Sequence, residues 1–80
     1  MAIVHLSGDL VQFADGLTEL EVDGARVIDI FRALRHRFPA LAGRLEHMAV
    51  AIDGEIYQDA DYRPVRPTSE IHLMPPVQGG

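Results

Sequence analysis

The sequence predicts an α+β fold in which a mixed sheet of four to five strands packs one face on a single main helix. Short segments of alternating or continuous hydrophobic residues predict the strands, and one long segment with a 3.6-residue hydrophobic period predicts the helix. The chain has 80 residues, of which 48% are hydrophobic and 24% charged, so we expect one small globular domain.

Two short strands are predicted ahead of the helix. The first is Ala2–Leu6, whose side chains alternate between two faces, and a turn at 7–9 follows it. The second is Thr18–Val22, which alternates strictly and turns two glutamates toward water. The segment 10–16 between them is compatible with an extension of either strand. We expect the two strands to form a hairpin.

The main helix follows a break at Asp23-Gly24, and Asp23 is expected to cap its N-terminus. Asp29 can pair with Arg32 one turn further on. Pro39 ends the helix, and residues 40–45 are expected to form a short helical turn or a loop. The hydrophobic positions with helical spacing are Val27, Ile30, Phe31, Leu34 and Phe38.

Three further strands are predicted after the helix. Met48–Ile52 is a continuous apolar run, which favours a buried strand. Asp53-Gly54 supplies the positive φ angles of a tight turn, and Glu55–Tyr57 is the return strand. Residues 58–69 are polar with two prolines and predict a loop, and Glu70–Met74 is the last strand. With the first and last strands as central neighbours, this order is that of a β-grasp, or ubiquitin-like, roll.

Composition excludes several functional classes. Twelve acidic residues against seven basic ones give a formal charge of −5, which repels nucleic acid and anionic membranes. The chain has no cysteine, so disulfides, thiolate metal sites and a thiol nucleophile are excluded. It has neither a long apolar run nor a basic signal segment, so we expect a cytoplasmic protein with no nucleic-acid or membrane partner.

Lysine is absent, because all seven basic residues are arginine. This excludes Schiff-base chemistry. Apart from its N-terminus, the chain offers no amine to which another group could be joined by an amide bond. Biased codon usage is the alternative explanation of this composition.

The spacing of histidines and serines supports neither a metal site nor a hydrolase. Ser7 and Ser69 have no base at a motif spacing. No metal is expected, because the histidines lack His-x-His or His-x-x-x-His spacing and fall on different elements. The four histidines are His5, His36, His47 and His72.

We assign residues 1–74 to the folded β-grasp domain and 75–80 to a flexible C-terminal segment. The prolines Pro75-Pro76 fix φ at about −65° and lack an N–H donor, so the segment is expected to project from the sheet. Gly79-Gly80 have no Cβ, so the terminal carboxylate can enter a narrow channel. The chain lacks a glycine-rich loop followed by lysine, so ATP-dependent activation of this carboxylate requires a separate enzyme.

The ending Met74–Gly80 resembles the Pro-Pro-Val-x-Gly-Gly ending of the molybdopterin synthase small subunit. Over its full 80 residues the chain is similar to the MoaD/ThiS family of ubiquitin-like sulfur carriers. Two segments depart from the family pattern. Asp53 stands where the family usually has asparagine, and Pro67-Thr68-Ser69-Glu70 replaces the usual Asp-Gly-Asp-Glu.

The resemblance implies a carrier that is a co-substrate or non-catalytic subunit and not an enzyme. An adenylating enzyme related to ubiquitin-activating enzymes would use ATP and magnesium to adenylate the Gly80 carboxylate, and a persulfide donor would convert it to a thiocarboxylate. In molybdopterin synthesis the sulfur then passes to a cyclic pterin precursor in the large synthase subunit. The chain itself would bind no cofactor. The tail residues that would enter these partners are Pro75, Pro76, Val77, Gln78 and Gly79.

Three alternatives remain beside this interpretation. The first is a ubiquitin-like modifier joined through Gly80 to a lysine of another protein. The second is a sulfur carrier for thiamine or another sulfur-transfer pathway. The third is a plain β-grasp interaction domain, whose function would survive deletion of Gly79-Gly80.

Strand alternation also predicts a docking surface. With Val50, Ile52, Ile71 and Leu73 turned toward the helix, the opposite side of the sheet carries an apolar patch beside His5 and His72. We expect this outer side to dock the adenylating enzyme. The residues of the patch are Ile3, Ala49, Ala51 and Met74.

Overall fold

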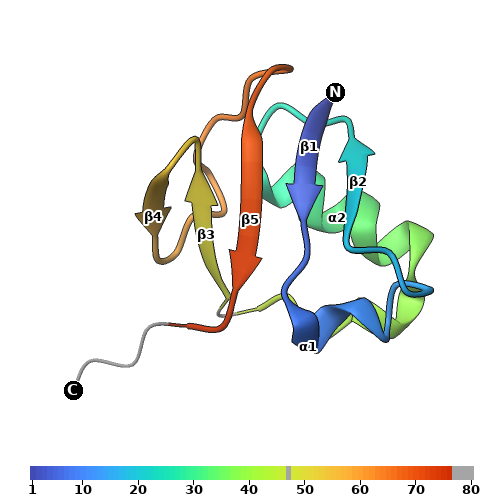
Figure 1. Cartoon of the computed structure of the whole chain (residues 1–80). Helices are drawn as coiled ribbons and strands as arrows, with labels where there is room; N and C mark the ends of the chain where they lie inside the picture. Colours follow the sequence, from blue (N-terminus) through green and yellow to red (C-terminus); the bar gives the residue numbers. More distant parts are fainter. Residues whose placement is uncertain (47, 77–80) are drawn as a thin grey trace.

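The computed structural model describes residues 1–46 and 48–76 and confirms the α+β prediction (Figure 1). Its elements in chain order are β1 (Ala2–His5), α1 (Gly8–Val11), β2 (Glu19–Val22), α2 (Val27–Arg37), the 3₁₀ turn η1 (Pro39–Leu41), β3 (Ala49–Ile52), β4 (Glu55–Tyr57) and β5 (Glu70–Met74).

The five strands form one mixed sheet in the order β2-β1-β5-β3-β4. β1 and β5 are parallel neighbours in its middle, as predicted, and the other adjacent pairs are antiparallel. α2 crosses one face of the sheet, and Figure 1 shows no described helix over the opposite face. This arrangement is the β-grasp roll that the element order predicts.

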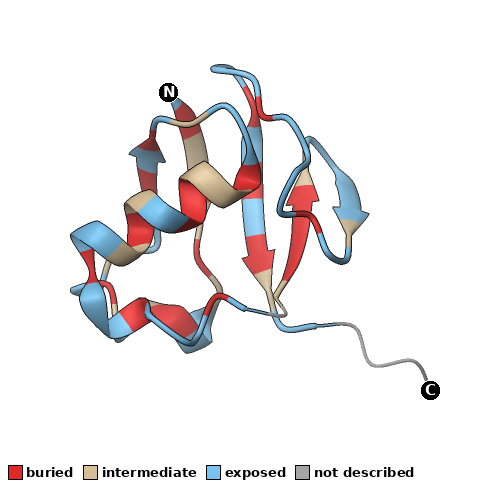
Figure 2. Cartoon of the chain, turned by 180° about the vertical axis from the view of Figure 1, so that it is seen from behind, coloured by how far each residue is buried: buried red, intermediate tan, exposed pale blue. Residues whose placement is uncertain are grey.

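The hydrophobic core lies between the sheet and α2. Strand alternation turns Val4, Val50, Ile71 and Leu73 inward, where all four are buried, and Ile52 is partly buried against them. Figure 2 shows buried positions alternating with exposed and intermediate ones along α2. The predicted inward faces of the strands are therefore confirmed. The buried residues of α2 are Val27, Ile30, Phe31 and Leu34.

The turn between β3 and β4 has the predicted conformation. Asp53 and Gly54 have φ angles of 50° and 91°. Positive φ at both central residues gives a two-residue turn the twist that antiparallel strands need. The turn fixes the register, in which Ala51 lies opposite Ile56 and Ile52 opposite Glu55.

The segment 10–16 does not extend either strand. Residues Gly8–Val11 form the short helix α1, and turns continue from there to Gly16. Leu10 and Ala14 are both buried, and their i, i+4 spacing turns both side chains toward the core in helical turns. A strand would have turned the polar Gln12 to the same face as these two residues.

The prediction that Asp23 caps the main helix is wrong. The N-cap is Arg26, whose N–H donates to the Asp29 carboxylate at 3.0 Å. The next two helical N–H groups, those of Val27 and Ile28, donate to the carbonyls of Arg63 and Asp61 at 3.1 and 2.8 Å. Backbone of the 58–69 loop thus satisfies the free donors that a capping side chain would otherwise meet.

The remaining expectations for the helix hold. Asp29 and Arg32 form an ion pair at 3.7 Å. The helix ends at Arg37, ahead of Pro39, and η1 falls at the start of the expected helical turn. No helix among residues 1–46 and 48–76 is long and apolar enough to cross a membrane.

Candidate functional site

The C-terminal segment begins where β5, the middle strand of the sheet, ends. β5 ends at Met74, and the two prolines after it, Pro75 and Pro76, are exposed. They line an open pocket together with α1, its following turn and the segment before β3. The other residues lining this pocket are Asp9, Leu10, Phe13, Gly43, Arg44 and Met48.

An arginine forms one wall of this pocket at the end of β5. The Arg44 guanidinium lies 3.7 Å from the centre of the Phe13 ring, a cation–π contact between the 43–48 segment and the turn after α1. The predicted tail residues Val77, Gln78, Gly79 and Gly80 lie outside the described residues, so their role stays a prediction.

The face of the sheet away from α2, here called the outer face, follows from the strand register. Cross-strand partners on it are Ile3 with Glu21 and Glu70, His5 with Glu19 and His72, and Ala51 with His72 and Ile56. Ala49 lies opposite Met74. The outer face therefore consists of Ile3, His5, Glu19, Glu21, Ala49, Ala51, Ile56, Glu70, His72 and Met74.

The predicted apolar patch lies on this face, but two of its members offer little surface. Ala49 is 0% and Ala51 6% exposed, although neither belongs to the core cluster beneath the helix. Small side chains in a central strand are covered by the longer ones on the neighbouring strands. Ile3 and Met74 are half-buried, and the most accessible apolar side chain of the outer face is Ile56, which is 58% exposed.

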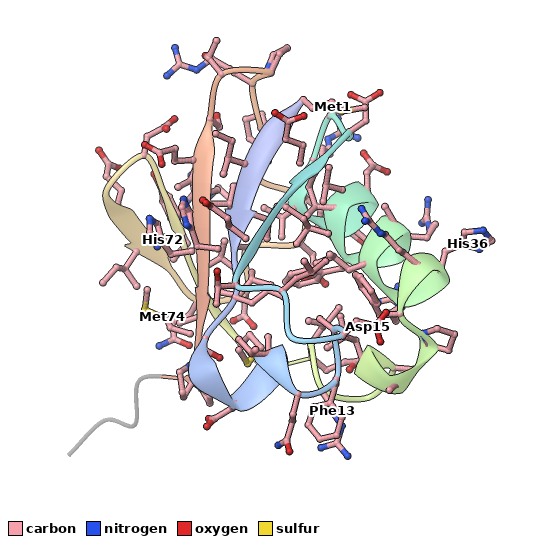
Figure 3. All side chains as sticks on the ribbon, turned by 45° about the vertical axis from the view of Figure 1, so that its right-hand side comes forward. Met1, Phe13, Asp15, His36, His72 and Met74 are labelled. Carbon is pink, nitrogen blue, oxygen red and sulfur yellow. The ribbon has the colours of Figure 1, made fainter. Side chains whose placement is uncertain are left out.

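Two histidines stack at the middle of the outer face. The rings of His5 and His72 lie 4.2 Å apart with 8° between their planes. His5 Nε2 is 3.1 Å from Glu70 Oε1, and His5 Nδ1 is 3.5 Å from Glu19 Oε2. Figure 3 shows His72 and Met74 on the side of the sheet opposite His36, which projects from α2. The histidine pair thus lies between the glutamates of β2 and β5 and the apolar side chains of β3 and β4.

The other sequence candidates are placed as follows. The Ser69 hydroxyl donates to the Asp53 carboxylate at 3.2 Å, so its contact is with an acid and not with a histidine base. The Ser7 hydroxyl is buried without a hydrogen-bond partner among the described residues. Within residues 1–46 and 48–76, no three histidine or acidic side chains are arranged to hold a metal ion. His47 lies outside the described residues.

The comparison with protein families covers nearly the whole chain. The ThiS family model matches residues 4–80, from β1 through the final Gly-Gly of the sequence. The chain belongs to the ThiS family. The predicted resemblance to ubiquitin-like sulfur carriers is therefore confirmed at the level of the family.

The proteins that resemble this ThiS-family chain in sequence or in structure carry different names. The molybdopterin synthase sulfur carrier subunit of Dictyostelium discoideum is 32% identical over 63 residues, 78% of this chain and 72% of that protein. The small archaeal modifier protein 1 from Methanosarcina acetivorans has a TM-score of 0.82 and 25% identity, covering 99% of this chain and 95% of that one. The Amycolatopsis orientalis BexX/CysO complex contains a chain with a TM-score of 0.85 and 20% identity, with full coverage of both chains.

Sequence reasoning placed Ile3, His5 and His72 of this ThiS-family chain on the outer face. It missed four members of that face, which are Glu19, Glu21, Ile56 and Glu70. Glu70 follows from alternation, because it lies two residues before His72. Ile56 follows from the two-residue turn, which pairs it with Ala51. Glu19 could be placed next to His5 only from the register between β1 and β2. No two-residue turn in the sequence fixes that register.

Proposed function

We propose that this chain is a sulfur carrier whose Gly80 carboxylate is adenylated and then converted to a thiocarboxylate. The observation that carries the proposal is the ThiS-family match, which extends through Gly79-Gly80. The carboxylate oxygen would attack the α-phosphorus of ATP and release pyrophosphate. The terminal sulfur of a persulfide would then attack the acyl carbon, and AMP would leave as the bond between that carbon and the phosphate oxygen breaks. A thiol of the donor would then attack the other sulfur of the resulting acyl disulfide, which releases the thiocarboxylate and leaves the donor as a disulfide.

Within this proposal the chain contributes a positioned tail and not catalytic groups. Pro75 and Pro76 have no N–H donor, so the segment after β5 cannot extend the pairing of β5 with its neighbours. ATP and magnesium are bound by the adenylating partner, and a persulfide donor supplies the sulfur. We place this cycle in the cytoplasm.

For the sulfur acceptor we propose the large subunit of a molybdopterin synthase. The name of the Dictyostelium relative supports this acceptor, as does the Pro-Pro-Val-x-Gly-Gly form of the tail. The outer face is proposed to dock the adenylating enzyme. A carrier for another sulfur-transfer pathway would use the same activation and differ only in the acceptor.

A second function is favoured by the Methanosarcina neighbour, which is named a modifier protein. In that case the activated Gly80 would pass to a lysine of another protein. Covalent adducts of higher mass in a cell extract distinguish this function, because a carrier returns to its free carboxylate after each transfer.

The first test is the intact mass of the chain after incubation with an adenylating enzyme, ATP, magnesium and sulfide. We expect a gain equal to one sulfur replacing one oxygen. Two matched controls are a chain without Gly80 and a chain with one alanine appended after Gly80, and both should show no gain. An unchanged mass of the folded wild-type chain with several adenylating enzymes would contradict the sulfur-carrier proposal.

A further inference from the structure

A cavity of about 330 Å³ lies beside α2, on the side of the sheet away from the outer face. It is formed by one face of α2, the segment just before β3 and the loop after β4. Ile28, Phe31 and Arg35 share that face of the helix, because they are spaced by three and four residues. The other residues lining the cavity are Leu45, Glu46, Met48, Asp59, Ala60 and Asp61.

The floor of this cavity is apolar. Phe31, Leu45 and Ala60 are buried, and Ile28 and Met48 are half-buried beside them. Apolar surface at the bottom of a cavity is removed from water when an apolar side chain of a partner covers it. The volume is at the lower end of the range of small-molecule sites, which is about 300–1,000 Å³. The cavity is therefore large enough for side chains of a partner protein and small for a large cofactor.

The rim of the cavity is charged. Glu46, Asp59 and Asp61 are exposed, and Arg35 is half-buried. Within residues 1–46 and 48–76, none of these four side chains forms an ion pair or a hydrogen bond. Three carboxylates and one guanidinium give the rim two more negative than positive charges. A cationic group of a partner therefore meets carboxylates that no described arginine of the chain already occupies.

Backbone contacts fix the loop that carries two of these carboxylates. The Asp61 carbonyl accepts the Ile28 N–H at 2.8 Å, and the Ala60 carbonyl accepts the Arg63 N–H at 2.9 Å. Asp59 has a φ of 51°, in the left-handed region that aspartate and asparagine adopt more readily than most other side chains. The loop is thus ordered before any partner binds, which lowers the entropy cost of binding.

We propose that this cavity binds a segment of a partner protein in which an arginine lies next to an apolar side chain. The apolar side chain would cover Phe31 and Leu45, and the guanidinium would pair with the carboxylates of Asp59 and Asp61. Arginine suits this site better than lysine, because its planar group can donate to carboxylates in pairs. A partner bound here leaves the outer face uncovered, so one protein can hold the chain while another docks on that face.

The test uses a blocked leucine-arginine-leucine peptide and the same peptide with citrulline, the uncharged analogue of arginine. Each is titrated into the ¹⁵N-labelled full chain and followed by NMR. We expect saturable shifts of the amide signals of Ile28, Arg35 and Ala60. The Kd should rise by about two- to fivefold with citrulline, the effect of losing one exposed ion pair. A peptide with alanine in place of both leucines should also bind more weakly, because it leaves the floor uncovered.

Two double variants of the chain locate the charge contact. Asp59→Asn combined with Asp61→Asn removes both loop carboxylates, and asparagine keeps the tolerance for positive φ at position 59. For this variant the arginine and citrulline peptides should have nearly equal Kd values. Glu19→Gln combined with Glu21→Gln is the matched control, because it removes two carboxylates from the outer face. It should keep the wild-type preference for arginine.

The results that would overturn the proposal are measured on the wild-type chain. Equal Kd values for the arginine and citrulline peptides would overturn the role of the carboxylates, and equal affinity of the alanine peptide would overturn the role of the apolar floor. Shifts confined to outer-face residues such as His72, or no saturable shifts, would overturn binding at the cavity. Thermal melts of both double variants verify that they are folded.

Discussion

At the scale of single residues, Asp53 links the turn between β3 and β4 to the start of β5. One carboxylate oxygen accepts the Glu70 N–H at 2.9 Å, and the other accepts the Ser69 hydroxyl at 3.2 Å and lies 3.4 Å from the Arg66 guanidinium. The two departures from the family pattern are therefore in contact.

These contacts make the stability of the fold depend on pH. The Glu70 N–H, and after it the Ser69 hydroxyl and Arg66, lower the pKa of Asp53 below its ordinary value of 3.8, against an opposing effect of desolvation. A carboxyl whose pKa is lower in the folded state stabilises the fold above its unfolded pKa, and this contribution is lost as pH falls through the folded pKa. The link between turn and strand is thus strongest near neutral pH.

We expect Asp53→Asn to lower the Tm at pH 7, because the neutral amide is a weaker acceptor for these donors. The difference from the wild type should shrink as pH falls below 3.8, since the wild-type carboxyl then becomes neutral as well. Thermal melts followed by circular dichroism between pH 7 and 2 measure this difference. Asp61→Asn, at an exposed loop position, serves as control. A Tm difference that stays constant over the whole pH range would contradict the role of the carboxylate charge.

At the scale of elements, the sequence predicts correctly the features that depend on neighbouring residues and fails for those that depend on contacts distant in the sequence. Alternation located β2, β4 and β5 to within one residue, and the Asp53-Gly54 turn was predicted from residue types alone, because local backbone preferences determine both. α1 has only four residues, too few for a helical period to be read. The cap at Arg26 was missed because the donors of α2 are satisfied by a loop more than thirty residues later in the chain.

The candidate site shows the same contrast between local preferences and contacts distant in the sequence. Which residues share the outer face follows from alternation, but their exposure depends on neighbouring strands. Ala49 and Ala51 are buried because β3 lies between β4 and β5, and this strand order results from contacts distant in sequence. The His5–His72 stack likewise needs the parallel pairing of β1 with β5.

The entry into α2 depends on a glycine without room for a side chain. A Cβ at Gly24 would lie 3.0 Å from Asp29 Cβ, 3.0 Å from Ile30 Cδ1 and 3.2 Å from the Ile30 nitrogen. Gly24→Ala should therefore destabilise the fold by about 1–3 kcal/mol, measured by urea denaturation. At Gly8 the same methyl group meets nothing within 4 Å, so Gly8→Ala should leave stability unchanged or slightly raised. Equal stability of both variants would show that the first turn of α2 can shift away from the methyl group.

At the scale of the whole molecule, the fold places Met1 and the start of the C-terminal segment at opposite ends of the two central strands. β1 and β5 are parallel, so Met1 lies ahead of the start of β1, and Pro75 and Pro76 follow the end of β5 at the other end of these strands. Figure 1 shows the N-terminus and the end of β5 on opposite sides of the molecule. Because lysine is absent, the amine of Met1 is the one amine of the sequence, and no side-chain amine lies near the tail. Under the proposed function, the lack of lysine protects an activated Gly80 carboxylate from capture by a side chain of its own chain.

This protection can be removed by a single substitution beside the tail. Arg44 lines the pocket that includes Pro75 and Pro76, so Arg44→Lys places an amine next to the segment that carries Gly80. In the adenylation assay the lysine nitrogen should attack the acyl carbon and displace AMP, giving an internal amide whose mass is lower than that of the free chain by one water. Thiocarboxylate yield should fall in proportion. Arg32→Lys, exposed on α2 away from this pocket, is the matched control and should give the wild-type yield. An internal amide in the wild-type chain, or an equal thiocarboxylate yield from Arg44→Lys, would show that the lack of lysine does not govern the fate of the activated tail.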